Sequence, residues 1–259
     1  MNTHTDRIRK QLSRLLTDAP LHPVADAHPK IYKQVLDART AFLQGFHEVL
    51  KASPEVLPQF LRDEPFQRRG FALEGAAMAL ALIDEVSPTP QRLLEALLNG
   101  RSAGEHTLSA IGVGWASARL GKPLDWLPMA LKPRYMPAVA DGYGFHQGFF
   151  HPHRFTSRGF PIGKGELSTS YDIGLGRALW FIHIGNVEPI VQTIERFTAD
   201  RRKQLWRGVG TACAFTGNTA YAAAQMSAAA VKFESYFHAG LETGTQLLHN
   251  LAQQRKKIL

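Results

Sequence analysis

The sequence contains one segment twice, at a constant offset of 133 residues. Residues 55–82 (EVLPQFLRDEPFQRRGFALEGAAMALAL) align without a gap on residues 188–215 (EPIVQTIERFTADRRKQLWRGVGTACAF). Seven positions are identical, where chance predicts about two; they are Glu55/Glu188, Gln59/Gln192, Arg68/Arg201, Arg69/Arg202, Gly75/Gly208, Ala79/Ala212 and Ala81/Ala214. We interpret the match as an internal duplication.

Two copies predict one domain over 1–259, built from two pseudo-symmetric halves at about 30–130 and 134–250. A solenoid generally needs three or more repeats, so we expect a globule instead. Ligand pockets often form where two structural units meet, and the junction between the halves is therefore the expected binding site.

Composition narrows the class of protein. With 259 residues, 44% of them hydrophobic, the chain can bury a sizeable core. Its formal charge of +8 is dispersed in small groups and accompanies no nucleic-acid motif, so we expect no nucleic-acid partner. The single cysteine, Cys213, excludes an internal disulfide and a thiolate metal cluster. The N-terminus lacks the apolar core of a signal peptide, which favours a cytoplasmic protein; the sequence does not indicate an oligomeric state.

Helical periodicity dominates, and the sequence predicts an all-α protein. Helices are expected over 30–52, 55–63, 65–86, 91–99, 105–120, 134–150, 171–184, 188–197, 200–216, 219–236 and 238–256. Residues 151–170, with two Pro and three Gly, predict an irregular loop or hairpin. Residues 1–28 combine a basic amphipathic helix with a Pro-rich connector, so a membrane-surface role stays an alternative.

Paired or central glycines recur inside the predicted helices. Each costs about 0.5–1 kcal/mol relative to Ala, so their repetition needs a compensating gain. Close helix–helix crossing and space for a ligand against the backbone are the two alternatives. The glycines are Gly70, Gly75, Gly112, Gly114, Gly142, Gly144, Gly148, Gly174, Gly176, Gly208, Gly210, Gly240 and Gly244.

Five of these glycine-rich segments resemble the ordered motifs of the bacterial domain-of-unknown-function family 1702. They are RRGFALEGAAMAL (68–80), IGVGWASARL (111–120), DGYGFHQGFF (141–150), DIGLGRALWF (172–181) and RRKQLWRGVG (201–210). The resemblance spans about residues 35–245. Some members of that family lie in gene clusters for enediyne polyketides, so the resemblance implies natural product biosynthesis and an apolar, unsaturated substrate.

Three charged or titratable residues within these motifs are candidate catalytic groups. Arg177 lies in an otherwise apolar helix, where it needs an anionic partner: Asp141, Asp172, Glu74 or a substrate anion. Glu74 aligns with Arg207 in the duplication, so a Glu74–Arg207 ion pair is one alternative, and a general acid or base with a raised pKa is the other. His146 is either a packed core histidine or the proton donor and acceptor.

We expect His146 and Arg177 to face the same central space, since each follows a Gly-x-Gly pair. The expected substrate-binding residues share the same motifs; they are Tyr143, Gly144, Phe145, Phe149, Trp115, Trp180, Trp206 and Gly208. Core packing is the alternative for the aromatic side chains. No zinc-binding or dinucleotide spacing is present, so neither a metal nor another cofactor is expected.

The sequence therefore leads to three functional hypotheses. The first is an isomerase, cyclase or lyase that encloses an apolar polyene, polyketide or isoprenoid-like substrate and transfers protons without a cofactor. The second is a non-catalytic carrier or assembly partner in a polyketide pathway. The third is a peripheral membrane protein.

Overall fold

The computed structural model describes residues 12, 27–51, 57–88, 92–99, 101–156, 165–216 and 219–258. These residues form helices and connecting turns, and no strand occurs among them. The helices are α2 (Pro29–Lys51), α3 (Leu57–Asp63), α4 (Phe66–Val86), α5 (Leu93–Leu98), α6 (Ala103–Arg119), η1 (Pro133–Tyr135), α7 (Met136–Phe150), α8 (Pro152–Phe155), α9 (Glu166–His183), α10 (Val187–Ile194), α11 (Ala199–Phe215), α12 (Thr219–Ala230), η2 (Val231–Phe233) and α13 (Glu234–Ile258). The predicted all-α class is confirmed.

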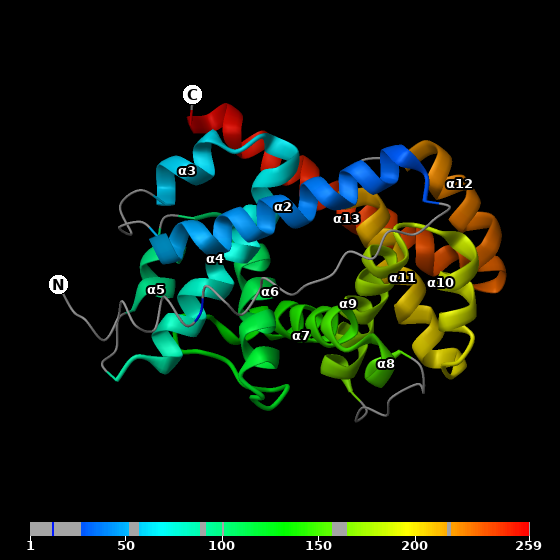
Figure 1. Cartoon of the computed structure of the whole chain (residues 1–259), viewed down its shortest axis with the longest axis horizontal. Helices are drawn as coiled ribbons and strands as arrows, with labels where there is room; N and C mark the ends of the chain where they lie inside the picture. Colours follow the sequence, from blue (N-terminus) through cyan, green and yellow to red (C-terminus); the bar gives the residue numbers. More distant parts are fainter. Residues whose placement is uncertain are drawn as a thin grey trace.

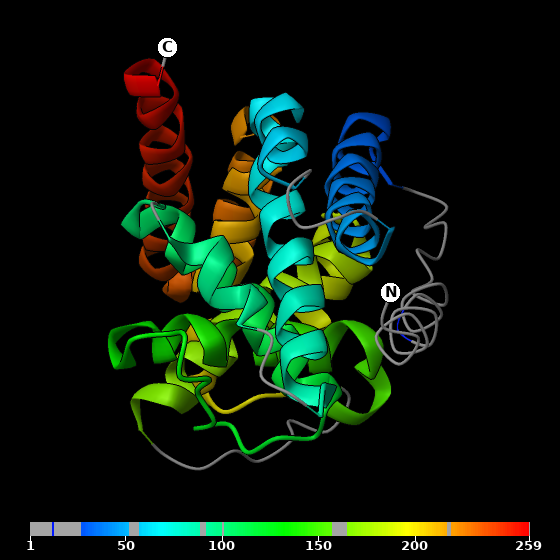
Figure 2. The same cartoon turned by 90° about the vertical axis from the view of Figure 1, so that its left-hand side faces the viewer.

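The longer helices pack in chain order, each against the next. The sequence of partners is α2, α4, α6, α7, α9, α11 and α13, and α13 also contacts α4 and α6. Figure 1 shows α7 and α9 at the centre, with α2 and α13 passing along the top. In Figure 2, α2, α4 and α13 stand side by side. Because α13 returns to the early helices, the array closes on itself.

Glycines set the distance at which consecutive helices cross. At the α9/α11 crossing, a Cβ on Gly208 would lie under 3.0 Å from the carbonyl oxygen of Ile173, and one on Gly176 would do the same at Leu205. Real side chains do not tolerate such an approach. Reciprocal contacts of this kind join α2/α4, α6/α7, α7/α9 and α11/α13 as well; their glycine pairs are Gly45/Gly75, Gly114/Gly142, Gly144/Gly174 and Gly210/Gly240.

One register describes all of these crossings. In each, a glycine meets the carbonyl three residues before the glycine of the partner helix. In α6, α7, α9 and α11 the first glycine of the Gly-x-Gly pair faces the preceding helix and the second faces the following one. At α4/α6, Gly112 meets the Glu74 carbonyl, and Ala77 takes the second position of the pair. Close crossing therefore accounts for the paired glycines.

The duplicated segments make equivalent contacts at their shared arginine. Arg69 donates hydrogen bonds to the carbonyls of Arg62 and Glu64, at the end of α3. Arg202 donates to the carbonyls of Glu195 and Phe197, after α10. These acceptors are offset by the same 133 residues as the sequence match. The division into two superposable halves stays a prediction, because the glycine contacts repeat from helix to helix rather than from half to half.

Most predicted helices appear within a few residues of their expected bounds. Both ends of the predicted loop at 151–170 are helical, since α8 occupies Pro152–Phe155 and α9 begins at Glu166, and the part of that prediction at 157–164 lies outside the described residues. The expected break between two C-terminal helices near residue 237 lies instead at η2, Val231–Phe233. The N-terminal amphipathic helix falls outside the described residues, apart from Leu12, which is helical and buried.

We predict that Gly208→Ala destabilises the protein by about 1–3 kcal/mol or more, because the new methyl group collides with the backbone of α9. Gly70→Ala is the matched control: its Cβ would meet only side-chain atoms of Leu108 and Leu251, at 3.5 Å or more. That variant should be neutral or stabilised by up to about 1 kcal/mol. Chemical denaturation measures both, and equal stability of the two variants would contradict the close crossing.

Candidate functional site

Two cavities adjoin the centre of the helical array, and Arg177 lines both of them. The aromatic pocket, as we call the first, has a volume of about 40 Å³. Its lining comes from α2, α4, α6, α7 and α9 and consists of Ala38, Arg39, Phe42, Leu43, Phe71, Glu74, Trp115, Phe145, Phe149, Phe150, Arg177 and Phe181. The larger cavity, of about 420 Å³, lies between α6, η1, α7, α9, α11 and α13.

Arg177 is held by two carboxylates from neighbouring helices. Its Nη1 donates to Oδ1 of Asp141 on α7, and its Nη2 lies 3.7 Å from Oε1 of Glu74 on α4. The three side chains are 4%, 14% and 3% exposed, respectively. Phe145 places its ring 5.2 Å from the guanidinium carbon, a cation–π distance. The anionic partners of Arg177 are therefore Asp141 and Glu74, two of the candidates named in the sequence analysis.

Burial raises the pKa of both carboxyl groups in this cluster, Glu74 and Asp141. Desolvation by burial raises the pKa of Glu74 to about 7, against the opposing influence of Arg177, and nearby Asp141 adds to the increase. Asp141 holds the direct hydrogen bond to Arg177, whereas the Glu74 oxygen stands beyond hydrogen-bond distance. One cation among two carboxyl groups makes a neutral cluster when one carboxyl is protonated. We assign that proton to Glu74.

One N–H donor of the Arg177 guanidinium takes no part in these contacts. Nε of Arg177 is buried and has no hydrogen-bond partner among the described residues. Leaving a charged donor unsatisfied in the interior costs about 1–3 kcal/mol or more. A ligand oxygen at this N–H would remove that cost.

The glycine register explains why these particular positions converge. Residues directly before the first glycine of a pair include Glu74, Asp141 and Arg207, and residues directly after the second include Arg177 and Phe145. These positions flank the crossing points, so their side chains face the interior of the array. Glu74 and Arg207 are equivalent in this register, since their carbonyls meet Gly112 and Gly240 respectively. They do not form a pair: Glu74 meets Arg177, and Arg207 lines the larger cavity.

The expectation that His146 and Arg177 face one space is wrong. His146 is buried on α7 but lines neither of the cavities that adjoin Arg177. It stands two residues after Gly144, whereas Arg177 stands one residue after Gly176, so Phe145 is the true equivalent of Arg177. One residue turns a side chain by about 100° around a helix.

The surroundings of His146 are aromatic. Its ring lies 4.7 Å from Phe150 and 6.0 Å from Trp115, between centroids, and neither ring nitrogen has a hydrogen-bond partner among the described residues. Burial lowers the pKa of His146 to about 3, with smaller contributions from Arg119 and His151. The imidazole is therefore neutral at physiological pH, which makes it a poor proton donor.

The structure separates the expected substrate-binding residues into two groups. Trp115, Phe145 and Phe149 line the aromatic pocket. Those outside both cavities have other contacts: Tyr143 donates to the Lys122 carbonyl at 3.0 Å, and Trp206 packs edge-on against Phe237. Trp180 is fully buried. Gly144 and Gly208 are crossing residues, with Tyr171 and Ile173 as their partners.

Sequence analysis left three residues of the aromatic pocket out of the expected binding residues, namely Phe42, Phe71 and Phe181. Helical spacing contained a usable signal for two of them. Phe71 precedes Glu74 by three residues and Phe181 follows Arg177 by four, which places each on the same helix face as the charged residue. Phe42 on α2 has no such link, because only the α2/α4 crossing brings it to the pocket.

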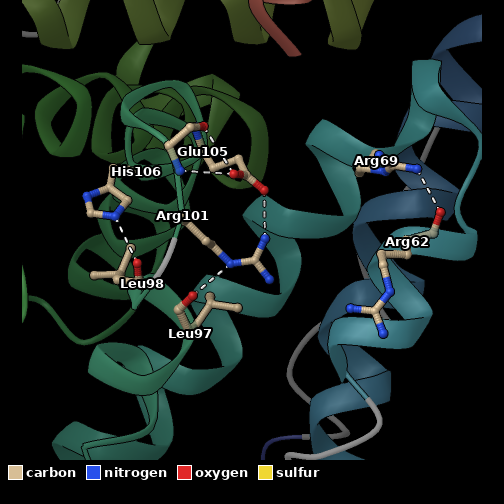
Figure 3. A network of polar contacts seen from close by, with 8 residues as sticks. Arg62, Arg69, Leu97, Leu98, Arg101, Glu105 and His106 are labelled. Carbon is tan, nitrogen blue, oxygen red and sulfur yellow. Dashed lines mark hydrogen bonds and ion pairs between the residues drawn. The ribbon is translucent and has the colours of Figure 1, made fainter. Parts of the chain in front are cut away.

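A third cavity, of about 360 Å³, lies beside α3, α4, α5 and α6 and is also rich in arginine. The side chains of Arg69 and Arg101 in its lining are hydrogen-bonded to backbone carbonyls and to Glu105 (Figure 3), and Arg62 donates to Gln59. Arg101 donates to the Leu97 carbonyl at 2.7 Å and to Glu105 at 2.8 Å, and Arg69 donates to the Arg62 carbonyl at 2.7 Å. Glu105 also completes a capping box with Ser102 at the start of α6. We assign this cavity a structural role.

Two negative observations concern the described residues only. No group of three His, Cys, Asp or Glu side chains among them is placed to hold a metal ion. None of the helices in that part of the chain combines the length and the apolar character that a membrane crossing requires.

We predict that the stability of the wild type falls relative to Glu74→Gln as pH rises. The unfolded chain releases the Glu74 proton near its ordinary pKa of 4.5, whereas the folded protein keeps it until the raised pKa of about 7. The loss of unfolding free energy of the wild type relative to Glu74→Gln should therefore grow between pH 4.5 and 7, to about 3 kcal/mol, and stay constant above this range. Denaturant titrations at several pH values measure it, with the exposed Glu195→Gln as control. Parallel pH profiles for wild type and Glu74→Gln would contradict the assignment.

Comparison with known proteins identifies the family but no activity. No significant match was found among curated proteins or solved structures. A family model described as protein of unknown function (DUF1702) matches residues 21–246, which include every residue of the Glu74–Asp141–Arg177 cluster and its aromatic pocket. The chain belongs to this family.

Proposed function

We propose that the protein is an enzyme that isomerises or cyclises an apolar polyene, polyketide or isoprenoid-like substrate by proton transfer, without a cofactor. The observation that supports this proposal most strongly is Glu74: a buried carboxyl group, with its pKa raised to about 7, in the wall of an aromatic pocket. A general acid or base works best when its pKa lies near the working pH. Glu74 replaces His146 as the proton-transferring residue in this proposal.

The chemistry suited to this cluster is a proton shift on an activated substrate. The Glu74 carboxylate takes a proton from a carbon next to an unsaturated carbonyl group, and the C–H electron pair moves into the conjugated system to give an extended enolate. The Arg177 Nε–H donates to the enolate oxygen. Protonated Glu74 then returns the proton to a more distant carbon, which moves the double bond and restores the enzyme. Cyclisation follows where the pocket folds the chain so that the enolate carbon adds to an electron-poor C=C carbon; that π bond breaks, and protonated Glu74 returns its proton to the carbanion formed.

Access to the pocket depends on its outer aromatic rings. At about 40 Å³ the pocket is smaller than most ligand sites, which are about 300–1,000 Å³. Phe149 and Phe150 are half-buried residues at the end of α7 and belong to the lining. We infer that they turn outward when the substrate enters, and that the rings of Phe145 and Trp115 then stack on its conjugated chain.

A deuterium-incorporation experiment tests the proposed function. Purified protein is incubated in heavy water with an apolar extract of cells that carry its gene, and products are analysed by mass spectrometry. We expect wild type to introduce solvent deuterium into at least one unsaturated compound, Glu74→Gln to abolish this, and Arg177→Lys to reduce it by about 10²-fold or more. Glu195→Gln, an exposed site, should match wild type. Incorporation that survives in Glu74→Gln, or none in the wild type, would contradict the proposal.

The deuterium-incorporation experiment also distinguishes the proposed enzyme from the second candidate function, a non-catalytic carrier. The larger cavity of about 420 Å³ favours this alternative, because it has the volume of a ligand site without needing Glu74. A carrier would retain an apolar compound through purification, unchanged in mass in heavy water, in both wild type and Glu74→Gln.

A further inference from the structure

The larger cavity between α6, η1, α7, α9, α11 and α13 differs from the aromatic pocket in its charge. Three arginines and one aspartate line it: Arg134, Arg177, Arg207 and Asp141. Asp141 is already bonded to Arg177. Two positive charges, those of Arg134 and Arg207, are therefore left without a carboxylate in the lining.

Arg207 is the distinctive residue of this cavity. It is half-buried on α11, and no hydrogen bond or ion pair engages its guanidinium within the described part of the chain. The carbonyl of Arg207 is occupied, accepting from the Thr211 hydroxyl at 3.0 Å, but the side chain is not. The third cavity differs in this respect, because the guanidinium groups of Arg69 and Arg101 there donate hydrogen bonds to carbonyls at helix ends and to Glu105 (Figure 3).

The other polar groups of the lining add to this contrast. Ser170 is 9% exposed, and its hydroxyl has no hydrogen-bond partner among the described residues. Arg134 is exposed, and within the described part of the chain its side chain donates to the Tyr135 hydroxyl alone, at 3.1 Å. Cationic side chains therefore outnumber anionic ones in this cavity. A half-buried guanidinium without an anion is unfavourable, and a ligand carboxylate would satisfy it with two parallel hydrogen bonds.

The rest of the lining is mainly apolar, and the hydroxyls of its three threonines, Thr107, Thr211 and Thr243, donate to backbone carbonyls. Ile111, Ile173, Phe215 and Leu247 contribute side chains from four different helices. At about 420 Å³ the cavity has the volume of a small-molecule site. An apolar wall with a cationic group at one position matches a molecule with an apolar chain and an anionic end.

We propose that this cavity binds an amphiphilic carboxylate, with its charged end on Arg207 and its chain among Ile111, Ile173 and Leu247. Arg134 attracts the anion from the exposed edge of the cavity. Binding here is a property of a second site, on the far side of Arg177 from Glu74, and does not depend on proton transfer in the aromatic pocket. The carboxylate is preferred to a phosphate because the planar guanidinium matches its two oxygens.

Calorimetric titration of the full chain with decanoate, below its micellar concentration, tests the proposal. We expect decanoate to bind at one site and decanol, of the same chain length but uncharged, to bind at least about tenfold more weakly. Arg207→Gln should weaken decanoate binding by about tenfold or more, the range for a lost charged hydrogen bond. Arg92→Gln is the matched control, because its side chain is 75% exposed and lies 4.0 Å from Glu95.

Two further variants keep the test decisive if Arg207→Gln folds poorly. Ile173→Trp places a larger side chain in the lining of the cavity and should abolish decanoate binding while circular dichroism stays helical. Glu74→Gln should bind decanoate as wild type does, because Glu74 lines only the aromatic pocket. No decanoate binding by wild type, or unchanged binding by Arg207→Gln or Ile173→Trp, would overturn the proposal. Tighter binding of decyl phosphate than of decanoate would overturn the preference for a carboxylate.

Discussion

The architecture depends on backbone contact between consecutive helices at their midpoints. Glycine at these positions lets a carbonyl of one helix rest where the next helix would otherwise have a Cβ. The helix-propensity cost of each glycine is offset by the packing of two backbones at close range. Once the crossing points are set, the residues on either side of each glycine pair are fixed in direction. The interior of the array is therefore determined by very few positions per helix.

The close crossings also place charged side chains in the interior, where they are shielded from water. Glu74 and Asp141 precede the glycines of α4 and α7, and Arg177 follows those of α9, so three different helices supply one buried cluster. Such a cluster is costly to desolvate, and replacement by apolar residues often stabilises a protein. We take its cost as a reason to assign it a function. The same register places Arg207 on α11 at the position equivalent to that of Glu74 on α4. No carboxylate among the described residues pairs with Arg207, which lines the larger cavity.

Much of the fold could be predicted from the sequence, because helical periodicity and cap residues act locally. The bounds of α2, α4, α7 and α11 follow from such signals. Close crossing was one of two interpretations that the glycine pairs left open, and the backbone contacts agree with it. The duplication predicted two halves, whereas these contacts repeat from helix to helix. The short helix α8 (Pro152–Phe155) was not predicted, since a helix of this length depends on tertiary packing.

The candidate site was only partly predictable, for a geometric reason. Arg177 and Glu74 could be found from charge in an apolar helix, and their pairing was one of the open alternatives. His146 was misplaced because a one-residue difference in its distance from the glycine pair rotates it away from Arg177. Phe42 reaches the pocket from α2, a partner that no local pattern specifies.

The central claim is that Glu74 holds a proton near neutral pH inside the helical array. Infrared difference spectroscopy measures this directly, because a protonated carboxyl group has a carbonyl band that a carboxylate lacks. Wild type should show such a band, lost in Glu74→Gln, which titrates with a pKa of about 7. A Glu74 band that is already lost when the pH rises to 5, or no difference between the two proteins, would contradict the account.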